Sequence, residues 1–131
     1  YIEPAGGQPG GWVKPVSLDA IDYKRLIGLN GQHFLGNALH TMLRASGMPD
    51  QPSIQVQTYY IARALTAFGA GCAIVDEYTA MTEPGELTIR PLDPEISFGI
   101  YLYRREDRNL SRAEQELVDK VAAVCKTRRQ P

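Results

Sequence analysis

Residues 61–75 read IARALTAFGAGCAIV, and this stretch decides the fold. Its first half predicts a helix over residues 58–68, which Gly69 ends. Apolar residues recur along that helix and are expected to point inward: Ile61, Ala62, Leu65 and Phe68. The wholly apolar run Cys72–Val75 follows after a short turn. A run of this kind is typical of a central strand that is covered on both faces.

Strands and helices alternate on either side of this stretch. The expected strands are residues 26–29, 53–57, 72–75, 87–92 and 96–103, and the expected helices are residues 32–46, 58–68 and 111–127. Ser111 and Glu114 have the spacing of a capping box and open the last helix. Alternating elements with short links predict an α/β fold with a mostly parallel sheet and helices on both faces. We expect residues 26–29, 53–57 and 72–75 to form its parallel core.

The composition is that of an ordinary globular domain. The chain has 131 residues, of which 44% are hydrophobic and 22% are charged, enough for one domain with a hydrophobic core. The net charge of −1 leaves no basic excess to neutralise phosphates, so the chain alone is a poor candidate for nucleic-acid binding. Its apolar runs are too short for a membrane span, and no signal peptide is visible. Because the chain starts without Met and inside a strand-like segment, we expect it to be a fragment of a longer protein.

The sequence offers no pattern typical of a metal site or a catalytic centre. Cys72 and Cys125 stand at apolar positions and are interpreted as small core residues, a usage that suits the reducing cytoplasm. With only His33 and His40 at unrelated spacings, they do not make a metal-ligand set. His33 and Asp76 could serve as a base and an acid, but no activated Ser or Cys stands at a turn suited to a nucleophile. We therefore expect no catalysis, no metal and no cofactor.

Polar residues follow the expected strands, where parallel sheets bind ligands. The carboxyl ends of parallel strands meet at one edge of a sheet, and helix N-termini point to that edge. The segments 30–34, 58–60 and 76–78 reach it. Their polar residues are the expected ligand contacts: Asn30, Gln32, His33, Thr58, Tyr59 and Asp76. Residues of these types suggest recognition through hydrogen bonds.

Some of these residues have a structural interpretation as well. Asp76 follows a buried strand and could cap the short segment 77–81 instead of contacting a ligand. His33 stands near a helix start, where a histidine often serves only as a hydrogen-bonding residue. Tyr59 and Tyr60 could line a cleft for an aromatic or acidic ligand, or one ring could pack on the sheet while the other lies in water.

Taken in order, several stretches resemble the second half of the effector-binding domain of LysR-type transcription regulators. The resemblance covers about residues 15–124. It is carried by PVSLDAI (15–21), LIGL (26–29), LRASG (43–47), IQVQ (54–57), IARALTAFGAGCAIV (61–75), LTIRPL (87–92), IYLYRR (100–105) and LSRA (110–113). The helix, Gly-x-Gly turn and strand of residues 61–75 are the most distinctive part. The family usually has a proline after this strand, where this chain has Asp76.

The resemblance implies a subdomain like those of type 2 periplasmic binding proteins. Residues 1–14 would be a crossover strand with a Gly/Pro-rich loop, and residues 15–131 would be the second effector-binding subdomain. Similar proteins hold a small-molecule effector between two subdomains, form homo-oligomers, and bind DNA through an N-terminal winged helix-turn-helix that is missing from this chain. They are cytoplasmic and bind no membrane. A carboxylate at Asp76 would disfavour the carboxylate effectors common in such proteins.

The same resemblance predicts an oligomer surface. Similar regulators pair their effector domains side by side, which would put helix 32–46 and the edge strand 53–57 in the contact. Leu35 and Met42 stand at the margin of the helix's apolar face, so they would be exposed without a partner. We expect this chain to self-associate through that edge or through its glycine-rich N-terminal segment.

Two other functions compete with that of an effector-sensing module. A fragment of a solute-binding protein would have a similar fold, but the order of the motifs is that of LysR-type regulators. A small α/β enzyme would need a nucleophile and a base clustered at the strand ends, and the sequence shows no such pair. The upstream reading frame separates these functions, because a winged helix-turn-helix there indicates a regulator and a signal peptide indicates a solute-binding protein.

Overall fold

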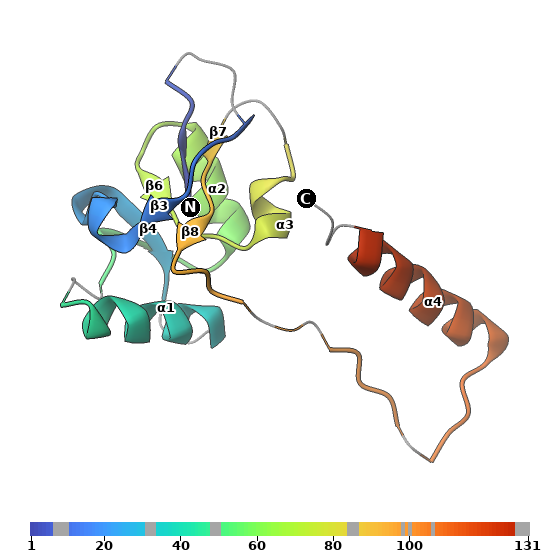
Figure 1. Cartoon of the computed structure of the whole chain (residues 1–131). Helices are drawn as coiled ribbons and strands as arrows, with labels where there is room; N and C mark the ends of the chain where they lie inside the picture. Colours follow the sequence, from blue (N-terminus) through green and yellow to red (C-terminus); the bar gives the residue numbers. More distant parts are fainter. Residues whose placement is uncertain are drawn as a thin grey trace. The chain divides into compact units, whose positions relative to one another are not determined.

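A computed structural model of the chain is shown in Figure 1. It describes residues 1–6, 11–30, 34–47, 51–83, 87–97, 99, 101–105 and 107–127. The chain forms two units, Tyr1–Phe98 and Gly99–Pro131. The first unit contains the sheet, and the second contains helix α4 (Arg112–Thr127).

Among the described residues of the first unit, a six-stranded sheet has the strand order β2-β7-β1-β6-β4-β5. Its strands are β1 (Ile2–Pro4), β2 (Gly11–Trp12), β4 (Leu26–Leu29), β5 (Ile54–Val56), β6 (Cys72–Ala73) and β7 (Leu87–Ile89). Strand β4 pairs in parallel with both β5 and β6, which confirms the predicted parallel core. Strand β6 lies between β1 and β4 and is buried, as its apolar run predicted.

Strand β1 lies in the middle of the sheet and runs antiparallel to both neighbours. Ile2 is opposite Ala73 of β6 on one side and opposite Ile89 of β7 on the other. Its side chain is 0% exposed, so the first strand of the chain belongs to the centre of the core. Strand β2 pairs in parallel with β7 at the edge.

The predicted strand 87–92 is split between two sheets. Strand β7 ends at Ile89, and the chain continues into β8 (Leu92–Asp93), which pairs in parallel with β3 (Val16–Ser17) in a separate two-stranded sheet. Arg90 lies at the break and donates hydrogen bonds to the carbonyl oxygens that precede β3, those of residues 14 and 15. These bonds fix the second sheet against the end of the first.

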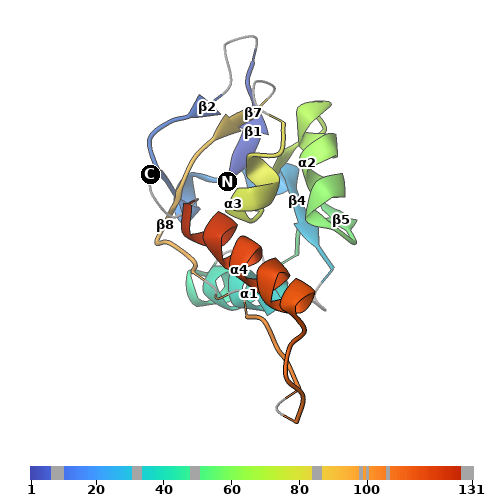
Figure 2. The same cartoon turned by 90° about the vertical axis from the view of Figure 1, so that its right-hand side faces the viewer.

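Helices cover both faces of the sheet, as predicted (Figures 1 and 2). The helices of the first unit are α1 (Phe34–Ala45), α2 (Tyr59–Ala67) and α3 (Glu77–Ala80), with 3-10 turns at Leu18–Ala20 and Tyr23–Arg25. Neighbouring residues of β4 belong to different core clusters because side chains alternate between the faces of a strand. Ile27 clusters with Ala62 of α2, whereas Leu26 clusters with Leu43 of α1.

The predicted inward face of helix α2 is half right: Ala62 is buried and Leu65 packs against the same core cluster, but the other two residues are exposed. Ile61 and Phe68, both expected inward, are 46% and 90% exposed. The buried positions of the helix are Ala62, Arg63 and Thr66. The hydroxyl of Thr66 donates to the carbonyl oxygen of Ala62 at 2.9 Å, so a small polar side chain is satisfied inside the core. The apolar pattern does not reveal this rotation because two of the buried residues are polar.

The predicted strand over residues 96–103 is wrong where the structure describes it. Residues 96, 97, 99 and 101–103 have no regular secondary structure, and residues 98 and 100 lie outside the described part. Leu102, expected inward, is 57% exposed. The rings of Tyr101 and Tyr103 contact each other, with centroids 6.5 Å apart. Alternation of apolar and polar residues makes a strand only where a neighbouring strand pairs with it.

The predicted capping box opens α4. The Ser111 hydroxyl accepts from the Glu114 N–H at 3.3 Å, and the Glu114 carboxylate accepts from the Ser111 N–H at 2.7 Å. Along the helix, the apolar stripe is exposed at Leu117, Val121 and Val124, and its packing on the sheet stays a prediction. Of the helices in the described ranges, none has the length and hydropathy needed to span a membrane.

Candidate functional site

The parallel strands β4, β5 and β6 end at one edge of the sheet. The residues that follow them there form what we call the strand-end site: Asn30, Thr58, Tyr59 and Asp76. The Asn30 N–H donates to the Val56 carbonyl oxygen at 3.1 Å, which extends the pairing of β4 and β5 by one residue. Gln32 and His33, the other predicted contacts, lie outside the described residues.

Tyr59 and Asp76 interact within the site. Tyr59 is the first residue of α2 and is half-buried, whereas Tyr60 is 64% exposed and lies in water. Burial, and after it the negative charge of Asp76, raises the pKa of Tyr59 to about 12. The phenol therefore keeps its proton at neutral pH and can both donate and accept a hydrogen bond.

Asp76 caps helix α3, which confirms the structural interpretation of this residue. Its Oδ1 accepts from the Thr79 N–H at 2.9 Å, and its Oδ2 accepts from the Thr79 hydroxyl at 2.7 Å. These bonds fix the carboxylate close behind β6. Capping leaves the group available to a ligand, since Asp76 is only half-buried and each carboxylate oxygen has a second lone pair.

Thr58 and Asn30 offer oxygen atoms of different kinds. The Thr58 hydroxyl oxygen accepts from the Ile61 N–H at 3.3 Å and caps α2, and its side chain is exposed. The Asn30 Oδ1 atom is buried and has no hydrogen-bond partner among the described residues. A buried acceptor without a partner costs about 1–3 kcal/mol.

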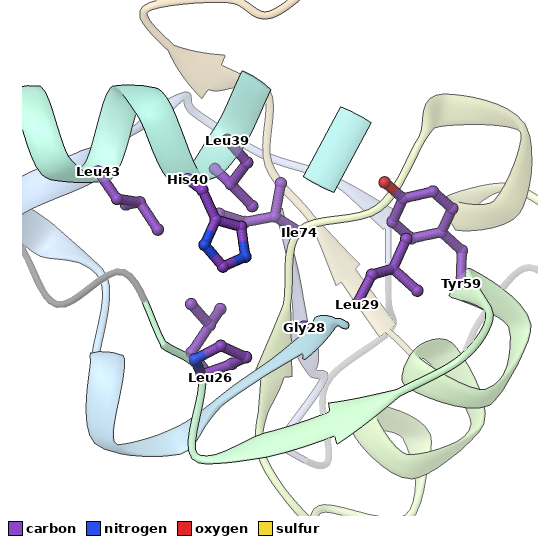
Figure 3. Close-up of a pocket in the computed structure, with 9 residues that line it drawn as sticks. Leu26, Gly28, Leu29, Leu39, His40, Leu43, Tyr59 and Ile74 are labelled. Carbon is purple, nitrogen blue, oxygen red and sulfur yellow. The ribbon is translucent and has the colours of Figure 1, made fainter. Parts of the chain in front are cut away.

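A mostly apolar pocket adjoins the strand-end site, between helix α1 and the sheet (Figure 3). It is lined by Leu26, Gly28, Leu29, Leu39, His40, Leu43, Pro52, Tyr59 and Ile74. The space that it encloses is about 20 Å³, which is room for about one water molecule. Of the strand-end site, Tyr59 lines this pocket, whereas Asn30, Thr58 and Asp76 are not part of its lining.

His40 is a polar residue of this pocket that the sequence analysis did not select. Figure 3 shows its imidazole pointing from α1 into the pocket. His40 follows Leu39 directly and lies three residues before Leu43, so a period of 3.6 residues places it at the margin of the buried face. This spacing is the feature of the sequence from which His40 could have been selected as a pocket residue.

The charged residues at these strand ends are acidic. The segments 30–33, 57–60 and 74–78 contain Asp76 and Glu77 but neither Lys nor Arg. In the part of the chain that the structure describes, no three or more His, Cys, Asp or Glu side chains gather as a metal site. The arrangement is therefore suited to holding a ligand by hydrogen bonds and apolar contact.

Comparison with known proteins gives a consistent family match. The LysR substrate binding domain family matches residues 10–126. The HTH-type transcriptional regulator AdmX of Serratia plymuthica is 32% identical over 106 residues, which are 79% of this chain and 33% of that protein. The HTH-type transcriptional regulator DgcR of Pseudoalteromonas sp is 30% identical over 97 residues, which are 73% of this chain and 33% of that protein. The chain thus spans about a third of the length of these relatives.

Proposed function

The chain belongs to the LysR substrate binding domain family, and from this premise we propose that it is the effector-sensing module of a bacterial transcription regulator. A small molecule binds at the strand-end site, and the binding is relayed to a DNA-binding domain elsewhere in the regulator. The observation that carries this proposal is that Asn30, Thr58, Tyr59 and Asp76 follow the parallel strands β4, β5 and β6, whose ends share the edge of the sheet where such folds bind ligands. The relatives are regulators, which favours this function over a solute-binding protein or an enzyme.

Each residue has a separate part in the proposed recognition. Asn30 accepts a hydrogen bond through its free Oδ1, and Tyr59 donates or accepts through its hydroxyl. Thr58 presents a hydroxyl at the start of α2, and Asp76 presents a carboxylate. Gln32 and His33 complete the proposed set from the segment between β4 and α1. No residue of this set has a catalytic role.

The proposed regulator is a cytoplasmic homo-oligomer that reaches DNA through another domain. Helix α1 and strand β5 form the proposed contact between copies. Two features support this: β5 is an edge strand of the described sheet, and Ile54 on it is 37% exposed. An unpaired edge with an apolar side chain is a surface that a second chain can cover.

The function is tested in a regulator that carries this domain. A library of small metabolites is screened for molecules that raise the melting temperature of the 131-residue chain. The fluorescence anisotropy of labelled operator DNA then reports the response of the regulator to each of these molecules. Thr58→Val should reduce the response at least about tenfold while basal DNA binding is kept, because it removes the hydroxyl.

Thr58→Ser is the matched control, since it keeps both the hydroxyl and the cap of α2. It should respond to the effector like the unchanged regulator. A response that survives both Thr58→Val and Gln32→Ala places the effector elsewhere and contradicts the proposal.

A further inference from the structure

We propose that the outer face of helix α2 is a contact surface for a second copy of this chain, and that two copies pack α2 against α2 about a twofold axis near Ala64. We call this face the α2 outer surface, and it consists of Tyr60, Ile61, Ala64 and Phe68. The contact is distinct from the one proposed for α1 and β5, and it forms whether or not an effector is bound.

Helix α2 has its polar side chains inside and its apolar side chains outside. Its charged residue, Arg63, is 5% exposed, and Thr66 is 0% exposed. In contrast, Tyr60, Ile61 and Phe68 are 64%, 46% and 90% exposed. A surface helix normally turns charged and polar groups to water, and a helix that is apolar on its outer side as well is normally covered there. The α2 outer surface is therefore the kind of surface that a partner covers.

Three of the exposed residues form a single ridge along the helix. Tyr60, Ala64 and Phe68 are spaced four residues apart, so they lie in one row on the helix surface. Rows of this kind on two helices fit between each other at a crossing angle of about −50°, the commonest class of helix packing. Ala64 has the smallest side chain of the row and stands midway between the two aromatic residues. Two backbones can therefore approach each other closely at this position.

The ridge is self-complementary, which is why a second copy fits it. A twofold axis at Ala64 that sets the helices antiparallel brings Tyr60 of each copy beside Phe68 of the other. Aromatic pairs of this kind are stabilised beyond the effect of their buried area, and opposed helix dipoles favour the antiparallel arrangement. Ile61 lies beside the ridge and widens the apolar strip. None of these residues is charged, so two copies meet without burying a charge.

The size of the surface fits a weak dimer. A buried aromatic side chain removes about 150–250 Å² from water, so two copies that cover Tyr60, Ile61 and Phe68 bury on the order of 1,000 Å² in total. Specific interfaces of this size are at the lower limit of their class. We therefore expect a reversible dimer with a dissociation constant on the order of 10–100 µM.

The α2 outer surface and helix α1 are on opposite faces of the sheet. Ile27 of β4 clusters with Ala62 of α2, whereas its neighbour Leu26 clusters with Leu43 of α1. A contact through α2 therefore leaves α1 free to form the contact proposed above. A chain with two different twofold contacts can assemble beyond a dimer.

Sedimentation velocity of the 131-residue chain between about 5 µM and 1 mM tests the contact. We expect a monomer–dimer equilibrium, and Ala64→Lys should weaken it at least about tenfold, because it places two like charges and two long side chains at the axis. Phe68→Ser should weaken it by a similar factor, because it removes one ring from each aromatic pair. Both positions are exposed, and Lys favours helices, so the fold should be kept.

Two further variants show whether the effect belongs to this surface. Tyr103→Ser is the matched control for Phe68→Ser, since Tyr103 is 89% exposed and lies in the second unit. It should leave the dimer unchanged. Met42→Lys charges the margin of α1 and should also leave the α2 contact unchanged.

Cysteine cross-linking provides a second measurement of the same contact. Two copies of residue 64 meet at the axis, so Ala64→Cys in a Cys125→Ser background should form a disulfide-linked dimer under mild oxidation. Cys72 is 4% exposed and does not compete. Ala122→Cys, at an exposed alanine of α4, is the matched control and should form this dimer much more slowly.

A chain that stays monomeric up to about 1 mM overturns the inference, because a second copy is then not the occupant of the α2 outer surface. A dimer that Met42→Lys abolishes and that Ala64→Lys and Phe68→Ser leave unchanged also overturns it, and assigns the association to α1. Equal rates of cross-linking for Ala64→Cys and Ala122→Cys contradict the position of the axis at residue 64.

Discussion

Asp76 accepts two hydrogen bonds from Thr79, one from its backbone N–H at 2.9 Å and one from its hydroxyl at 2.7 Å. This pair joins the end of a central strand to the first turn of α3. It holds a charged group at the edge of the sheet in a defined orientation. The same interaction therefore contributes to stability and sets the electrostatic character of the strand-end site.

Asp76→Ala should lower the free energy of unfolding by about 1 kcal/mol, because it removes a helix cap. Asp76→Asn should lower the free energy of unfolding by only about a few tenths of a kcal/mol, since the amide oxygen still accepts from the Thr79 N–H. Urea denaturation followed by circular dichroism measures both variants. Equal losses for Ala and Asn would show that the carboxylate, rather than the cap, carries the stability.

Gly71→Ala should destabilise the chain by about 3 kcal/mol or more. A Cβ atom at this position would lie 2.1 Å from the carbonyl oxygen of Arg25, which is backbone and cannot move aside cheaply. Gly69→Ala is the comparison: its φ of +81° disfavours a side chain, but the space around it is open, so the cost is about 1 kcal/mol. If Gly69→Ala has a lower urea midpoint than Gly71→Ala, the close approach between residue 71 and the Arg25 carbonyl oxygen is contradicted.

Arg63→Met should change the free energy of unfolding by no more than about 1 kcal/mol, whereas Arg63→Ala should cost about 3 kcal/mol. Arg63 is 5% exposed and pairs with Glu83, but its Nε–H has no partner among the described residues, so one buried donor is left unsatisfied. Met fills the volume of the buried stem without that cost, and Ala leaves a cavity. Thermal denaturation of the two variants gives the comparison, and a larger loss for Met than for Ala would refute it.

Stability should decrease above pH 10 in part because of Tyr59. Its pKa is about 12 in the folded chain and 10 in the unfolded one, so the unfolded chain releases this proton first as the pH rises. The folded state therefore loses stability between these values, by about 1 kcal/mol after allowance for the half-exposed position of the ring. Tyr59→Phe should show a smaller decrease over the same range in urea titrations. An identical pH dependence in both proteins would contradict the assignment.

The parallel core was predictable because β4 and β6 lie in short apolar runs and β5 in a short alternating one, and these patterns are visible in the local sequence. The orientation of α2 was not predictable in the same way. Arg63 and Thr66 are buried and Phe68 is exposed, whereas a prediction based on apolar residues alone exposes the first two and buries the third. The alternation over residues 96–103 failed for a related reason, since pairing depends on a neighbour that local sequence does not contain.

The candidate site was predictable where it depends on topology. Residues after parallel strands meet at one edge in any such sheet, which places Tyr59 and Asp76 there, and their role as ligand contacts stays a prediction. The pocket residue His40 was missed because it projects from the middle of a helix, and its place depends on how α1 lies on the sheet.

Strand β1 has a consequence for the order of events during synthesis. Ile2 is made before its partners Ala73 and Ile89, which lie 71 and 87 residues further along the chain. At roughly 5–20 residues per second, a ribosome leaves the first strand without its partners for several seconds. Both flanking strands must be present before this segment can enter the sheet, so closure of the sheet is a long-range step that follows the formation of the helices. Among the strands of this sheet, β1 leaves the ribosome before its partners β6 and β7 and can pair fully only after both have followed.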